Sequence, residues 1–352
     1  MRGQRSEVRG QRHPILPSAW LAIVALAMAC APATTPPPAR IPTPVPTPPA
    51  IEPTPAPVRI AREGMIDGGA GKLWYSIAGS GADTVIVPLA SWLAPSLSPL
   101  GGRFTIVFYD PRHRGRSHTM ADSMAATFDG DVADLESVRV AIGAPRISVI
   151  GYDYYAAVAA AWAALHPQAA TRLVLLSPIE PADSLAQNWN PPERMARLDT
   201  TAARGLVKAR AAGRDTTELV GYCQQFWRVN TPIFVGDTAR VSAVHADWCG
   251  LPNESPARVA MSSGKTLSSL GPGMDFAART RGITSPTLVM HGRLDLIANP
   301  EGAREWTRRI DGARLLWMSN VGHLPFFEAP QPMVGAIGEF MAGTWPPRAG
   351  PP

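Results

Sequence analysis

The sequence predicts an α/β fold: a mostly parallel, doubly wound β-sheet with helices on both faces and an inserted helical cap. From about residue 61, short apolar runs alternate with helical runs. Such alternation is typical of parallel strands that are buried on both faces and joined by helices. The alternation stops over residues 181–276, which are rich in alanine, arginine and polar residues and contain helical stretches but no clear series of strands.

Seven segments have the short, apolar character of buried strands. In chain order they are residues 73–77, 84–87, 104–109, 147–150, 172–176, 287–290 and 314–318. A helix is predicted over residues 131–140, because Val132, Leu135 and Val138 share one face and Gly143 can end it. Residues 156–162 contain only alanine, valine and tryptophan, which indicates a buried helix.

The N-terminal segment has the composition of an export signal. Four arginines precede an apolar stretch from Ile15 to Ala29, so residues 1–29 are predicted to be a signal peptide. The stretch ends in Leu-Ala-Met-Ala-Cys, which resembles the lipobox of bacterial lipoproteins and makes Cys30 the predicted lipidation site. The alternative is an ordinary secretory peptide with an incidental cysteine.

Residues 30–60 are predicted to be a linker that follows the lipobox cysteine. Residues 31–59 include twelve prolines and cannot form a core, so an extended polyproline II spacer is expected. The predicted location is therefore that of an exported bacterial lipoprotein, anchored to a membrane and facing the periplasm or the cell surface. A disordered leader without an anchor is the alternative.

Composition favours a small-molecule partner over nucleic acid. The formal net charge is +5, and it falls to about +2 when residues 1–29 are removed with their four arginines and one glutamate. So small a charge is not typical of a nucleic-acid-binding domain. Cys223 and Cys249 can pair in an exported protein, and two buried free thiols are the alternative. No His or Cys cluster accompanies them, so no metal site is predicted. No other cofactor is implied either, and the sequence does not indicate an oligomeric state.

Asp153 is the most informative residue of the chain. It is the third residue of Gly-Tyr-Asp-Tyr-Tyr at 151–155, between a predicted strand and a predicted buried helix. This order resembles the nucleophile elbow of the α/β-hydrolase superfamily, Gly-x-Ser-x-Gly, with Asp153 in the place of serine and Tyr155 in the place of the second glycine. A carboxylate can attack carbon without first losing a proton.

Three further motifs strengthen the resemblance, which covers about residues 61–345. Residues 109–117 resemble the structural "YDxRGxGxS" loop of the superfamily, with His113 where glycine is common. Residues 291–295 resemble "HGxxD", which implies that Asp295 orients the base. His323 follows the last predicted strand and is implied to be that base. The superfamily architecture implies core segments at 61–180 and 277–345 and the cap at 181–276.

The oxyanion region departs from the superfamily pattern. Pro88-Leu89-Ala90-Ser91-Trp92 stands where family members carry "HG" after an early strand. Because backbone N–H groups can stabilise an oxyanion whatever the side chains are, the candidates are the N–H groups of Tyr154 and Ser91.

The carboxylate nucleophile is similar to that of epoxide hydrolases and haloalkane dehalogenases. This resemblance implies hydrolysis of a small, mostly apolar electrophile through a covalent Asp153 ester, with His323 activating water. An epoxide is favoured over a halide. Tyr222 is the only tyrosine of the cap segment and, with help from Tyr152 or Tyr154, the candidate acid for the leaving oxygen. Trp92 and Phe326 are candidates to line the substrate pocket.

Two alternatives remain open at the level of sequence. Overall likeness to proline-iminopeptidase-like and esterase-like members favours an acyl hydrolase with an altered nucleophile. The substituted nucleophile, Tyr155 and the altered oxyanion loop together favour a catalytically decayed binding protein.

Overall fold

The computed structural model describes residues 60–119, 126–181, 189, 191–256, 258, 259, 266, 269 and 276–351. The predicted signal peptide, Cys30 and the proline-rich linker lie outside the described residues. None of the helices in the described segments is both long and apolar enough to cross a bilayer.

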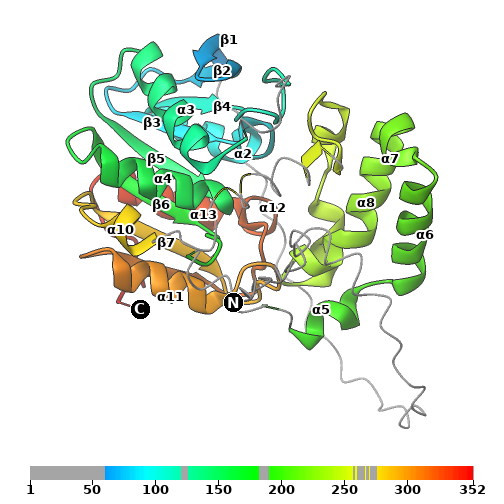
Figure 1. The fold of residues 1–352 in the computed structure, drawn as a ribbon. Helices are drawn as coiled ribbons and strands as arrows, with labels where there is room; N and C mark the ends of the chain where they lie inside the picture. Colours follow the sequence, from blue (N-terminus) through cyan, green and yellow to red (C-terminus); the bar gives the residue numbers. More distant parts are fainter. Residues whose placement is uncertain are drawn as a thin grey trace, which may run out of the picture.

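The core is one eight-stranded sheet with the strand order β1-β2-β4-β3-β5-β6-β7-β8. Only β2 runs against its neighbours, and all strands from β4 to β8 are parallel. Figure 1 shows the sheet with helices packed around it. The strand bounds are β1 Ile60–Gly68, β2 Gly71–Ala78, β3 Thr84–Pro88, β4 Thr105–Tyr109, β5 Ile147–Tyr152, β6 Ala170–Leu176, β7 Thr287–Gly292 and β8 Arg314–Met318.

Seven of these strands contain the predicted segments, and the α/β fold class is confirmed. The central strands β5 and β7 are buried at every position, as expected of a parallel sheet that is covered on both faces. Strand β1 was not predicted. It is an edge strand of sequence IAREGMIDG, in which polar residues and glycine interrupt the apolar pattern.

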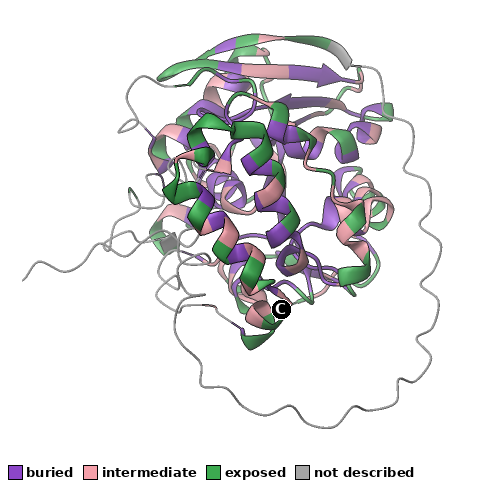
Figure 2. Ribbon diagram, turned by 90° about the vertical axis from the view of Figure 1, so that its right-hand side faces the viewer, coloured by how far each residue is buried: buried purple, intermediate pink, exposed green. Residues whose placement is uncertain are grey.

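Two groups of helices cover the sheet, and the helices within each group contact one another. Helices α3 (Phe128–Ala141), α4 (Tyr154–Leu165) and α10 (Phe276–Thr280) form one group. Helix α2 (Ala90–Leu97) packs with η2 (Ser98–Gly102), α12 (Pro325–Glu328) and α13 (Pro330–Met341), and α11 (Pro300–Arg309) packs on β7 and β8. Figure 2, a view from the right-hand side of Figure 1, shows helices that carry both buried and exposed residues.

The segment between β6 and β7 is helical where the structure describes it. Apart from α10, its elements are α5 (Pro192–Arg197), α6 (Thr200–Ala211), α7 (Arg214–Thr217), α8 (Leu219–Phe234) and the 3₁₀ turns η4 (Thr238–Ala243) and η5 (Asp247–Gly250). Figure 1 shows α6, α7 and α8 grouped beside the sheet layer. Cys223 and Cys249 form a disulfide that joins α8 to η5, so the structure contains the pairing that the sequence left open.

A buried carboxylate fastens this helical segment to the core. Both side-chain oxygens of Glu254 accept hydrogen bonds from the Arg114 guanidinium, at 2.8 and 2.9 Å. The Trp92 indole donates to the same carboxylate at 3.0 Å, and so does the Gly115 N–H at 2.8 Å. A buried charge is tolerated when it is paired and fully hydrogen-bonded, so Glu254 holds the cap segment in a defined position above α2.

Candidate active site

The backbone at Asp153 has the strained turn that the sequence predicts between β5 and α4. Asp153 has φ 52° and ψ −124°, a conformation that few residues other than glycine adopt. Gly151 makes the turn possible, because a Cβ atom there would lie 2.4 Å from the Tyr155 carbonyl oxygen. The Asp153 N–H donates to the Leu176 carbonyl of β6 at 3.0 Å. The turn therefore presents the carboxylate at the carboxyl edge of the sheet, where parallel α/β folds place their ligands.

Tyr155 fits beside the turn because its side chain has partners there. Its ring packs edge-on against the Tyr154 ring at 5.0 Å, and its hydroxyl hydrogen-bonds Arg114. The bulky residue in place of the second glycine therefore leaves the elbow intact.

The three predicted catalytic side chains meet at this edge. The imidazole Nδ1 of His323 lies 2.9 Å from Asp295 Oδ2, and its Nε2 lies 3.6 Å from Asp153 Oδ1. Asp295 and His323 are almost fully buried, whereas about a quarter of the Asp153 side chain (26%) is exposed. Asp153 is thus the member of the three that a substrate can reach.

Asp295 is fixed from several sides. Its Oδ1 accepts the backbone N–H groups of Ile297 and Ala298 at 2.8 and 2.9 Å. Its Oδ2 lies 3.5 Å from His291 Nε2, behind the bond to His323. These contacts leave Asp295 in one orientation, which fixes the orientation of the His323 ring.

Burial and charge shift the pKa values of this group. Burial alone would lower the pKa of His323, but the neighbouring Asp295 carboxylate and, less strongly, Asp153 raise it above its usual value. Burial raises the pKa of Asp153, although His323 and the Tyr154 N–H oppose the shift. Burial would also raise the pKa of Asp295, but His323 holds it below its usual value. The imidazole therefore favours its charged form while both carboxylates are ionised.

One of the two predicted oxyanion donors is wrong. The Tyr154 N–H bonds the Asp153 carboxylate, as expected of the first residue after a nucleophile. The Ser91 N–H instead donates to Asp110 Oδ1 at 2.8 Å, so it is not available to a substrate. That bond forms because Asp110, at the end of β4, is buried and accepts backbone donors from both Ser91 and Arg116.

The N–H group of Ala90 is a candidate oxyanion donor that the sequence analysis missed. Its N–H is the first of α2 and makes no hydrogen bond with the described residues. Strands β3 and β5 are parallel neighbours, so Ala90, two residues after β3, and Asp153, directly after β5, follow the same edge of the sheet. Leu89 before it has φ 67°, the left-handed conformation usually given to glycine. Aligning Leu89 with the family's glycine would have identified Ala90 from the sequence.

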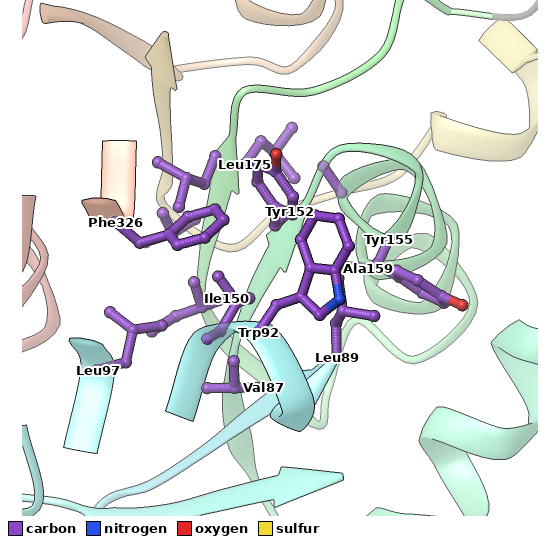
Figure 3. Packing of buried hydrophobic residues seen from close by; sticks show 14 of the residues in the cluster. Val87, Leu89, Trp92, Leu97, Ile150, Tyr152, Tyr155, Ala159, Leu175 and Phe326 are labelled. Atoms are coloured by element: carbon purple, nitrogen blue, oxygen red, sulfur yellow. The ribbon is translucent and has the colours of Figure 1, made fainter. Parts of the chain in front are cut away.

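Aromatic side chains from three elements line the site. Figure 3 shows Trp92, Tyr152 and Phe326 converging between the sheet and α2. The Phe326 ring lies 6.5 Å from Trp92 and 5.1 Å from Tyr152. The Trp92 ring stacks on Trp248 of the cap segment at 4.5 Å. Two predicted pocket residues, Trp92 and Phe326, are thus in the aromatic layer beside the site.

The two tyrosines predicted to serve as acids are not placed for that role. The Tyr152 hydroxyl donates to the backbone carbonyl of His323 at 3.1 Å, and its side chain is buried beneath the base. Tyr222 lies on α8, and its charged neighbours are Arg210 and Asp215 of the outer cap segment, not the catalytic group. The sequence could not show which face of α8 would turn toward the site.

Tyr154 is committed elsewhere as well, because its hydroxyl donates to Asp131 of α3 at 2.8 Å. Across the part of the chain that the structure describes, no group of three or more His, Cys, Asp or Glu side chains could hold a metal ion.

Comparison with known proteins identifies the family. The family model described as alpha/beta hydrolase fold matches residues 68–330. The chain belongs to the α/β-hydrolase superfamily. By this membership it is classed with the hydrolases, and the predicted resemblance is confirmed.

Curated relatives match only in part. A proline iminopeptidase of Xylella fastidiosa is 40% identical over 73 residues, which cover 21% of this chain and 23% of that one. A pimeloyl-[acyl-carrier protein] methyl ester esterase of Nitrosospira multiformis is 33% identical over 66 residues, which cover 19% and 25%. The chain thus matches about a quarter of the length of these relatives.

Solved structures share the fold over most of the chain. An enol-lactonase from Burkholderia xenovorans has a TM-score of 0.60 at 20% identity, covering 79% of this chain and 100% of that one. A 2-hydroxy-6-oxo-6-phenylhexa-2,4-dienoate hydrolase from a Rhodococcus species has a TM-score of 0.60 at 19% identity, covering 81% and 100%. At this identity the likeness establishes the fold alone.

Proposed function

We propose that the protein hydrolyses a small, mostly apolar alkyl electrophile through a covalent ester of Asp153. The observation that supports this most is the position of the Asp153 carboxylate. It stands at the apex of the strained turn, is partly exposed, and lies 3.6 Å from the His323 imidazole. A carboxylate in that position is a nucleophile that needs no base to activate it.

The first step is displacement at carbon. An Asp153 oxygen forms a bond to the electrophilic carbon, and the leaving group departs with its electron pair. Esterification removes the negative charge of Asp153, one of the three carboxylates that raise the pKa of His323. The pKa of His323 therefore falls at this stage, and the neutral imidazole that can act as a base is favoured.

The second step is hydrolysis of the ester. His323, oriented by Asp295, takes a proton from water, and the hydroxide adds to the Asp153 carboxyl carbon. The N–H groups of Tyr154 and Ala90 are the proposed donors that stabilise the oxyanion. Collapse expels the alkoxide, which takes the proton back from His323 and leaves as the alcohol. The Asp153 carboxyl group then loses its proton to solvent, so the overall reaction is R–X plus water giving R–OH and HX.

The positions of the tyrosines favour one class of leaving group. Opening an epoxide was expected to use Tyr222 with help from Tyr152 or Tyr154. Tyr222 lies among outer cap residues, Tyr152 donates to a backbone carbonyl and Tyr154 donates to Asp131. A leaving group that departs as a stable anion needs no such acid. Electrophiles of that kind fit the described side chains better than epoxides do.

Acyl hydrolysis is a second candidate, because the partly matching relatives are an esterase and an iminopeptidase. Attack of Asp153 on an ester would give an anhydride, whose carboxylate is a much better leaving group than an ordinary alkoxide. The reaction would then run backward unless the ester is activated. This chemistry favours alkyl over acyl substrates for the chain as it stands.

Export and lipid anchoring are part of the same proposal. The signal-peptide pattern and Cys30 support them, and a cap disulfide is typical of proteins outside the reducing cytoplasm. Labelling of bacteria with a tagged fatty acid tests the anchor. We expect label on the wild-type chain and none on Cys30→Ser, and equal labelling of both would reject Cys30 as the lipidated residue.

A turnover panel tests the proposed chemistry. Wild type, Asp153→Asn and Asp153→Ser are compared on alkyl halides, alkyl sulfonates, epoxides and activated esters. We expect hydrolysis of an alkyl member by wild type and a loss of at least about 10³-fold in Asp153→Asn, comparable to the loss of other catalytic nucleophiles. Activity on esters alone that increases in Asp153→Ser would favour the acyl candidate. Turnover of no member by a folded wild type would favour a binding protein.

A further inference from the structure

The loop that carries His323 is held by the cap segment as well as by the core. The His323 N–H donates to the Phe234 carbonyl at the end of α8, at 2.7 Å. The Phe234 ring also meets the His323 ring at 5.9 Å with a steep interplanar angle of 62°. The backbone and the ring of the proposed base are therefore both in contact with the last residue of the longest cap helix.

Glu328 joins the same two segments with one side chain. Its Oε2 accepts the Gly236 N–H from the cap segment at 2.7 Å, and its Oε1 accepts the Gly322 N–H at 2.9 Å. The Leu324 N–H makes a longer bond to Oε1, at 3.3 Å. Glu328 is only 3% exposed, so these donors are what compensates its burial.

The backbones of the two segments touch at glycines. A Cβ atom on Gly236 would lie 2.7 Å from the Gly322 nitrogen, and one on Gly322 would lie 2.4 Å from the Gly236 nitrogen. The guanidinium groups of two arginines complete the junction. Arg197 of α5 donates to the carbonyls of Val235 and Gly236, and Arg240 of η4 donates to the Glu328 carbonyl.

We propose that Glu328 is a positioning residue for His323, and that it acts by fixing the end of α8 and the base-bearing loop together as one unit. Glu328 touches neither Asp153 nor the proposed substrate position through any described hydrogen bond, so it acts through His323. The inference rests on the proposed function only for the role of His323 as base. One consequence is that the orientation of the imidazole depends on where the cap helix ends.

The variant that tests this most directly is Glu328→Gln, which keeps the size of the side chain. A glutamine cannot accept three N–H bonds, because its NH₂ group would face one of the donors. The amide also removes a carboxyl group that, when ionised, raises the pKa of His323; Asp295, Asp153 and His291 are the other titratable groups that affect it. We expect the His323 ring to titrate at lower pH, as followed by NMR of its ring nitrogens.

Turnover gives a second measurement on the substrate that the panel identifies. An unpaired buried N–H group destabilises the position of the loop that carries His323. We therefore expect kcat to fall by about tenfold or more. Because Glu328 does not contact substrate, KM is expected to change little. Glu328→Asp keeps the charge at shorter reach and is expected to retain the His323 titration while losing part of kcat.

A matched control is Asp134→Asn. Asp134 is another buried carboxylate; it lies on α3 and accepts a hydrogen bond from Arg112. This variant is expected to lower the unfolding temperature without moving the His323 titration. An unchanged His323 titration and unchanged kcat in folded Glu328→Gln would overturn the proposal.

If Glu328→Gln does not fold, hydrogen exchange in the wild-type chain decides. We expect the N–H groups of Gly236, Gly322 and His323 to exchange at similar, slow rates, because one opening event exposes all three. Widely different rates would refute the single unit. The outcome is separable from that of the proposed function, because neither the titration nor the exchange rates require Asp153 to be a nucleophile.

Discussion

Asp153 stands in a backbone conformation that only a sharp turn between strand and helix produces, and its carboxylate faces the His323 imidazole at 3.6 Å. Serine usually occupies this place in the superfamily. The proposed chemistry therefore differs from that of serine hydrolases because of one side chain, while the turn that carries it is the one expected for the superfamily. The strain is tolerated because Gly151 lets the following helix pass close to the strand, and because Tyr155 has its own partners outside the turn.

The sequence predicted which side chains lie together where a motif fixes their position, and it did not where a single contact decides the position. Asp295 and His323 meet because each follows a strand of one parallel sheet. Ser91 was predicted as a donor, but Asp110 takes its N–H, and this contact between two loops has no sequence signature. No motif in the sequence analysis points to Glu328, so its bond to Gly236, 92 residues away, could only be seen in the structure.

Gly322→Ala tests the close backbone contact at the base-bearing loop. The added methyl group would meet backbone atoms of Gly236 and Phe234 at 2.4 and 2.6 Å, which cannot move independently. We expect a loss of about 1–3 kcal/mol in the free energy of unfolding, measured with denaturant. Gly335→Ala is the matched control. That glycine is exposed on α13 with open space around it, so alanine should stabilise the helix by up to about 1 kcal/mol. Equal effects of the two substitutions would contradict this account.

At the scale of elements, the apolar runs identified seven strands because each of these strands contributes buried side chains to the core. Strand β1 escaped prediction because an edge strand is half exposed and needs no continuous apolar run. Helix α8 was expected only as part of a helical cap. Its packing, with Trp227 against Trp92 at 5.2 Å and Phe234 on the base, depends on tertiary contacts that periodicity alone does not give.

The disulfide belongs to this scale, because it connects α8 to η5 across 26 residues. Replacing both cysteines by serine is expected to lower the free energy of unfolding by about 3 kcal/mol, from the added freedom of the unfolded chain. Denaturant unfolding of the Cys223→Ser/Cys249→Ser variant measures the loss, and Cys30→Ser is the control that leaves the disulfide in place. A wild-type midpoint that stays the same with and without a thiol reductant, once the bond is shown to be reduced, would refute this expectation.

At the scale of the molecule, buried acids make stability depend on pH. Burial raises the pKa of Asp131 to about 7 and that of Glu328 to about 7. Both groups bind protons more tightly in the folded state, so the stability they confer is present below about pH 4 and is lost as the pH rises through about 7. The raised pKa of His323 acts in the same direction. The lowered pKa values of His291 and Asp295 act in the opposite sense: that of His291 below its usual value of 6.5, and that of Asp295 only below its usual acidic pKa. Asp131, Glu328 and His323 together outnumber His291 in the neutral range.

We therefore expect the unfolding temperature to rise as the pH is lowered from 8 to 5.5. Asp131→Asn should flatten this dependence, because asparagine still accepts the Tyr154 hydroxyl and carries no charge at any pH. Thermal unfolding at a series of pH values provides the comparison. If the unfolding temperature of the wild-type protein decreases as the pH is lowered from 8 to 5.5, these carboxyl groups are not protonated as described.

The measurement that tests the central claim most directly is the intact mass of His323→Gln after incubation with the panel of electrophiles. Without its base, the protein should form the ester at Asp153 and stop there. We predict a mass gain equal to the transferred group of one panel member, located at Asp153 by peptide fragmentation and absent in His323→Gln/Asp153→Asn. A folded His323→Gln protein that gains no mass from any member, including one that the wild type hydrolyses, would contradict covalent catalysis by Asp153.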